Sequence, residues 1–260
     1  MARVRVATLL IAAFLSFAGC SALFEFNAFS SLDKPAAPKL SDYQGSGGLA
    51  KLQQDLSSAA VVAMLKANPA TTQQIEGYLA ATYLPPADAE GQTAAALYAD
   101  LNLKTTSGDQ LINNAVTAVI SEPSWNGDIK SILTSIIPSD VIHDKTAFEA
   151  MVGGLLAADS AYMQLGTSIP SIGVPQGMNM GDVAQKAAVA YIVYTVVDQV
   201  KSQPPGFPDN AAAMDQLFFL VNDQPNTIGG DSIASNPLDP NAPVGWLKNI
   251  FDAASVPYPG

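Results

Sequence analysis

The feature that most constrains this chain is a set of apolar stripes at helical spacing. In residues 111–120 the apolar side chains recur at i, i+1, i+4, i+5, i+8 and i+9, and residues 129–137 repeat much of this pattern. A period near 3.6 residues places such side chains on one face of an α-helix. Pro123 and Pro138 follow the two stripes and end them. The sequence therefore predicts two amphipathic helices here.

The same period extends through most of the chain after residue 48. The further stretches are 49–65, 75–83, 88–101, 144–163, 187–201, 209–221 and 243–251. Asp88, Asp144 and either Asp209 or Asn210 stand where N-caps are expected. Residues 166–179 and 222–243 have the composition of loops. No alternating strand pattern with a hairpin turn is present in the sequence.

We therefore expect an all-α fold of about eight or nine helices with a long C-terminal loop. Helix starts near residues 49, 88 and 128 are about forty residues apart, which is a spacing found in helix-pair repeats. The chain has no matching residues at that period. An irregular multi-helix bundle and a short helical-repeat-like array both remain open.

The N-terminus has the layout of an export signal. Arg3 and Arg5 precede an apolar run over residues 6–17, which is too short for a comfortable membrane span. Ala18 and Gly19 are the small residues that a signal peptidase requires, and Cys20, the single cysteine of the chain, follows at once.

A small pair followed directly by cysteine resembles the lipobox of bacterial lipoproteins. The resemblance implies that residues 1–19 are a signal peptide and that Cys20 is the first mature residue and carries the lipid. Phe17 stands where that family usually has leucine. By analogy with enterobacterial sorting, Ser21 favours the periplasmic face of the outer membrane over the inner membrane. An ordinary secretory signal and an uncleaved anchor are the alternatives.

Charge limits the partners of the mature chain. Residues 20–260 contain ten Lys and Arg against 23 Asp and Glu, a net charge of −13. An acidic surface disfavours nucleic acid and anionic lipid headgroups, so the lipid on Cys20 would provide the membrane attachment. No cysteine remains after Cys20 for a disulfide or a thiolate metal site.

Composition also suggests how the mature chain is organised. Residues 20–47 hold several Pro and Gly and are predicted to be a flexible tether, followed by a single helical domain over residues 48–260. Mean hydropathy is +0.20 with only 13% charged residues. Such a composition indicates close-packed Ala-rich helices, an apolar interface or an apolar cavity. The candidate lining of a cavity is Tyr162, Met163, Tyr191, Tyr194 and Met214.

Residues suited to catalysis or metal binding do not form a recognisable pattern. His143 is the single histidine and is expected in a helix connection, and no serine elbow accompanies it. Asp223, Asp231 and Asp239 offer oxygen ligands of the kind that suits calcium, but their spacing fits no EF-hand and turn chemistry explains the loop better. We therefore expect no cofactor and no enzymatic activity. The leading hypothesis is a lipid-anchored envelope domain that binds a protein partner, and the alternative is a carrier of an apolar or small organic ligand.

Overall fold

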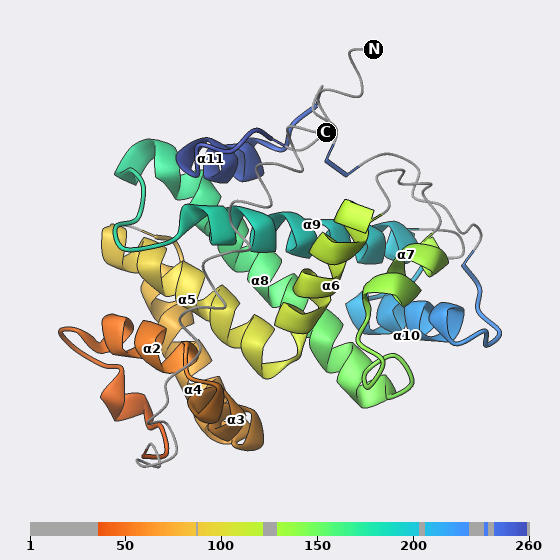
Figure 1. Cartoon of the computed structure of the whole chain (residues 1–260), viewed down its shortest axis with the longest axis horizontal. Coiled ribbons are helices and arrows are strands. Elements are labelled where there is room, and N and C mark those ends of the chain that lie inside the picture. The colour runs from red at the N-terminus through yellow and green to blue at the C-terminus, as the bar shows by residue number, and fades with distance from the viewer. Residues whose placement is uncertain are drawn as a thin grey trace.

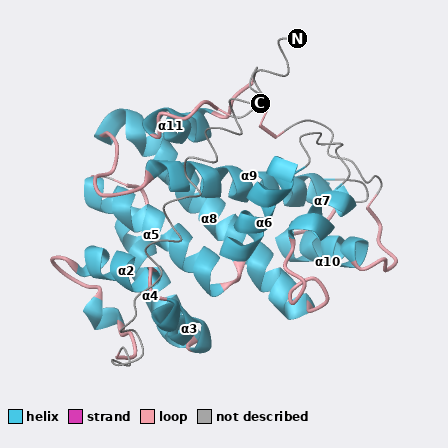
Figure 2. Cartoon of the chain, viewed as in Figure 1, coloured by secondary structure: helices cyan, strands magenta, loops and turns pink. Residues whose placement is uncertain are grey.

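The computed structural model describes residues 36–86, 88–121, 129–202, 206–228, 237–238 and 242–258. In these ranges the chain is built from helices and loops, without a strand (Figure 2). The helices are η1 (Leu40–Asp42), α2 (Gly48–Leu56), α3 (Ala59–Ala67), α4 (Pro69–Tyr83), α5 (Ala89–Thr105), α6 (Gly108–Ser121), α7 (Ile129–Ile136), α8 (Lys145–Ile172), α9 (Met180–Ser202), α10 (Asn210–Val221) and α11 (Gly245–Ala253). The prediction of an all-α fold is confirmed.

Helix α8 lies in the middle of the molecule (Figure 1). It contacts α5, α6, α9, α10 and α11, of which α5 and α11 are far from it along the chain. In a solenoid each repeat contacts mainly its sequence neighbours. The described helices therefore form an irregular bundle rather than a repeat array.

Alanine and glycine allow these helices to approach closely. Twelve alanines are buried in the hydrophobic core, among them Ala94, Ala158 and Ala187. A Cβ added at Gly154 of α8 would lie 2.2 Å from the Thr106 Oγ1 atom at the end of α5. The high apolar content of the chain is thus used in tight helix packing.

Acidic caps define several helix starts as expected. The carboxylates of Asp88, Asp144 and Asp209 accept hydrogen bonds from backbone N–H groups three residues further on, at 2.9, 3.0 and 2.9 Å. Each bond satisfies a donor that has no partner within the helix. These three predicted caps are confirmed.

The predicted single helix over residues 49–65 is two helices. Ser57 closes α2 with a backbone bond to Gln54, and its hydroxyl bonds to the carbonyl of Gln53. Ser58 is extended, with φ −95° and ψ 113°, and α3 begins directly after it. Serine bonds readily to nearby backbone groups, which competes with helix continuation.

The predicted tether and the predicted loop after residue 165 also differ from the structure. Tyr43 is fully buried, and its hydroxyl donates to Asp55 at 2.9 Å, so the part of the predicted tether around Tyr43 is fixed on the helices. Helix α8 continues to Ile172 and contains Pro170. The earlier part of the tether and the predicted signal peptide lie outside the described residues.

Candidate functional site

The structure does not bring the five predicted cavity residues into one cavity. Tyr162 is fully buried, Met163 and Tyr194 are exposed, and Tyr191 and Met214 are half-buried. The rings of Tyr191 and Tyr194 stack with their centroids 6.2 Å apart. Helical phase turns Tyr162 into the core, whereas Met163 and Tyr194 face outward.

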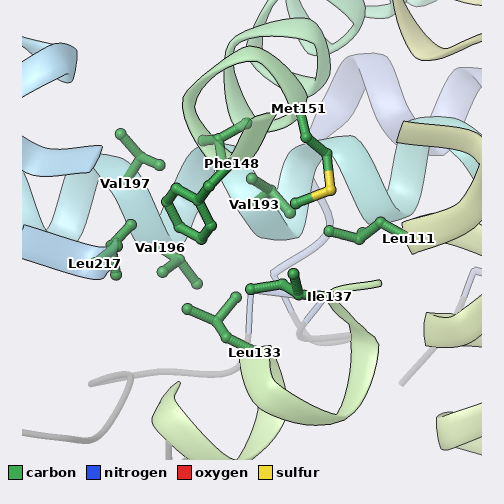
Figure 3. A pocket seen from close by; sticks show the side chains of 10 residues that line it. Leu111, Leu133, Ile137, Phe148, Met151, Val193, Val196, Val197 and Leu217 are labelled. Atoms are coloured by element: carbon green, nitrogen blue, oxygen red, sulfur yellow. The ribbon is translucent and has the colours of Figure 1, made fainter. Parts of the chain in front are cut away.

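A cavity does exist elsewhere, between α6, α7, α8, α9 and α10 (Figure 3). Its lining is entirely apolar: Leu111, Leu133, Ile137, Phe148, Met151, Val152, Val193, Val196, Val197 and Leu217. The space open to the centre of a water molecule is only about 10 Å³. A void of this size is at the lower limit for one water molecule. An organic ligand would need the surrounding side chains to move.

A buried lysine forms the centre of a polar cluster in the core. Lys186 of α9 lies 2.8 Å from Asp100 of α5 and 2.8 Å from Asp182 one turn before it. Burial alone would lower the pKa of Lys186, but Asp100 and then Tyr162 and Asp182 raise it well above its usual value. Lys186 is therefore a charged group that joins α5 to α9 through the interior.

Tyr162 completes this cluster from α8. Its hydroxyl is buried and has no hydrogen-bond partner in the described residues. Burial and the Asp100 charge raise the pKa of Tyr162, so the phenol stays protonated. The cluster has an ordered ion pair but no nucleophile beside a free base, and its geometry fits a structural role.

A second buried polar group, Asp159 of α8, lies apart from the lysine. It is 6% exposed, and its Oδ1 atom has no hydrogen-bond partner in the described residues. Burial raises the pKa of Asp159 to about 7. Burial disfavours the ionised form of this carboxylate, and a proton or a nearby cation would stabilise the group.

We name the following residues of α8, α9 and α11 the aromatic seam: Asp159, Met163, Tyr191, Tyr194 and Trp246. Tyr191 contacts Trp246 of α11 edge-on at 5.8 Å and stacks on Tyr194. Asp159 acts electrostatically on Tyr194, and Met163 lies one helical turn after Asp159. Met163 and Tyr194 are 39% and 41% exposed. The seam thus joins exposed apolar groups to a buried charge.

The motifs of the sequence do not single out Lys186 or Asp159. A usable signal was present, because each is a charged residue placed on the apolar face of its helix. Asp159 falls between Leu155 and Tyr162, at the four- and three-residue spacing of the buried stripe. A charge in that position either pairs inside the fold or marks a binding site.

His143 lies in the connection between α7 and α8, as predicted. Its Nδ1 atom pairs with Asn222 Oδ1 at 2.6 Å, and Asn222 Nδ2 donates to the Ile142 and Phe218 carbonyls. Asn222 therefore links this connection to the end of α10. The imidazole has a structural partner and faces no nucleophilic side chain in these contacts.

The calcium candidates are only partly within the described ranges. Asp223 has a left-handed backbone, with φ +54°, and forms an ion pair with Lys130. Asp231 and Asp239 lie outside the described residues. Among the residues that the structure describes, no group of three or more His, Cys, Asp or Glu side chains is arranged to hold a metal ion.

Two further observations bear on the class of protein. Within the described ranges, no helix is both long enough and apolar enough to cross a bilayer. Comparison with protein-family models, with curated proteins and with solved structures finds no match for this chain. The fold and the site define an all-α, multi-helix protein with a charged cluster in its core and an aromatic seam on its surface.

Proposed function

We propose that this chain is a lipid-anchored protein of the bacterial cell envelope whose helical domain binds a protein partner without catalysis. The anchor is the lipid on Cys20, and Ser21 favours the periplasmic face of the outer membrane. The observation that supports a binding role is the aromatic seam. Met163 and Tyr194 are exposed, and Tyr194 stacks on half-buried Tyr191, which in turn contacts Trp246.

Side chains of this kind are typical of protein interfaces. Aromatic residues and methionine are enriched in interface centres, where they bury large areas at a small cost in side-chain entropy. The seam also occupies stable elements, because α8, α9 and α11 pack directly on one another. A partner would therefore meet a preformed surface.

The small volume of the apolar cavity beside Phe148 gives the carrier role no support. Ligand pockets for organic molecules are generally several hundred Å³ in volume, about 300 or more. The cavity beside Phe148 offers about 10 Å³ to a water centre. Mass spectrometry of residues 20–260 under native and denaturing conditions separates the two roles. The interaction role predicts equal masses, whereas extra mass lost on denaturation would support the carrier.

The anchor has an independent test in Cys20→Ala. This substitution removes the thiol to which the lipid is attached, so the variant should accumulate as an unacylated precursor with residues 1–19 still present. Intact-mass analysis of the membrane fraction measures both properties. A processed and acylated Cys20→Ala protein would contradict the proposed anchor.

A further inference from the structure

Asp159 lies near the middle of α8. Phe148 lies eleven residues before it and Gly166 seven residues after it, so all three share one face of the helix. The ring of Phe148 packs on that of Phe218 of α10, with the centroids 5.6 Å apart. The Gly166 carbonyl accepts a hydrogen bond from Asn249 of α11. Asp159 therefore lies between the places where α10 and α11 dock on α8.

The aromatic side of the seam has a negative electrostatic environment. Burial raises the pKa of Tyr194, and the charges of Asp198 and Asp159 raise it further. Tyr194 stacks against Tyr191, yet 41% of its surface remains exposed. A positive group beside this ring would gain from both carboxylates and from the ring quadrupole.

We propose that the aromatic seam binds a lysine or arginine side chain of a protein partner, with Asp159 as its counter-ion and Tyr194 as the ring against which it packs. This proposal rests on the proposed function and specifies the chemistry of the partner. The Asp159 Oδ1 atom is buried and has no partner in the described residues, so the side chains around it must open before a partner's cation can reach it. A charge-assisted contact would then neutralise the carboxylate.

The net charge of the mature chain agrees with this choice of partner. Residues 20–260 have a net charge of −13, so a basic surface is attracted over distances longer than the contact itself. Arginine and lysine also have long methylene stems, which can cover Met163 while the charged end reaches the carboxylate. An acidic or purely apolar segment would leave Asp159 buried and unpaired.

The test uses residues 20–260 and side-chain analogues as probes. The probes are n-butylammonium and n-propylguanidinium, with n-butanol as the neutral control, and NMR follows the Met163 methyl and Tyr194 ring signals. Both cations should shift these signals in a saturable manner. Asp159→Asn should weaken the binding by about tenfold or more, as expected for loss of a charged partner.

A matched control removes the same charge elsewhere. Asp140 is exposed in the α7–α8 connection, and Asp140→Asn should leave cation binding unchanged. Equal affinity in Asp159→Asn, or equal shifts with n-butanol, would overturn the cation site. Since the probes are small molecules, that failure would leave the interaction role itself intact. The interaction role is tested separately by crosslinking in cells.

Discussion

Asn249 of α11 donates from Nδ2 to the main-chain carbonyl of Gly166 in α8, at 3.0 Å. In a regular helix that carbonyl would accept from the N–H of residue 170, but residue 170 is proline and has no N–H. Asn249 therefore satisfies the acceptor that Pro170 leaves without its helical donor. This bond explains how α8 continues to Ile172 through a residue that usually ends a helix.

The bond between Asn249 and Gly166 should be coupled to Pro170. Asn249→Leu is expected to lower the free energy of unfolding by about 1–2 kcal/mol, because a partly buried carbonyl loses its donor. In the Pro170→Ala background the alanine N–H restores that donor, so the same substitution should cost less. Urea denaturation of the four proteins measures the coupling. Equal losses in both backgrounds would contradict this account.

At Gly166, α8 and α11 lie so close together that the position has no room for a side chain. A Cβ at Gly166 would lie 2.2 Å from the Trp246 carbonyl oxygen, whereas a Cβ at Gly153 of the same helix meets no atom within 4 Å. Gly166→Ala should therefore destabilise the protein by about 1–3 kcal/mol. Gly153→Ala should stabilise it by about 0.5–1 kcal/mol through helix propensity. Thermal unfolding of the two variants measures both changes in stability. An equal effect of the two substitutions would contradict the prediction.

Asp159 should make stability depend on pH between about 4 and 7. Its carboxyl has an ordinary pKa of 3.8, but burial raises this pKa to about 7 in the folded chain. The folded state thus binds more protons than the unfolded state in this pH window. The contribution of Asp159 to the free energy of unfolding therefore falls as pH rises.

Asp159→Asn removes that contribution. The variant should match the parent near pH 4 and be more stable by roughly 2–4 kcal/mol at pH 8, at about 1.36 kcal/mol per pKa unit. Denaturation curves at several pH values give the difference directly. A difference that stays constant across this range would show that Asp159 is not held in its neutral form by burial.

Asp100 and Asp182, the two carboxylates that pair with Lys186, should contribute unequally to the stability of the fold. Both lie 2.8 Å from Lys186, but the side chain of Asp100 is 28% exposed and that of Asp182 is 49% exposed. Asp100→Asn should destabilise the protein by about 1–3 kcal/mol, because the buried lysine loses its less solvated partner. Asp182→Asn should cost less than about 1 kcal/mol. Chemical denaturation measures the loss of unfolding free energy in each variant. A larger loss in Asp182→Asn than in Asp100→Asn would contradict this prediction.

Helical periodicity and capping made most of this fold predictable. The caps Asp88, Asp144 and Asp209 mark starts that the structure confirms, because an N-cap acts on a donor only three residues away. The prediction of a loop after residue 165 was wrong because a contact between distant residues decides the outcome there. Pro170 remains inside α8 because of Asn249, which is 79 residues later in the chain.

The candidate site was less predictable for the same reason. Sequence alone identified Met163, Tyr191 and Tyr194 as apolar groups of interest, but the choice between cavity and surface depends on helix packing. Lys186 and Asp159 are notable because they are buried charged groups. Whether each finds a partner depends on the neighbouring helices. Lys186 meets Asp100 of α5, whereas Asp159 meets no donor in the described residues.

Photocrosslinking in cells tests the central claim most directly. A photoreactive residue replaces Met163 in the seam or, as control, Leu84, which is more exposed at 55% against 39%. The account predicts a discrete protein adduct from position 163 that Tyr194→Ala abolishes, and no such adduct from position 84. Adducts that are equal at both positions, or that persist in Tyr194→Ala, would contradict a partner-binding role for the seam.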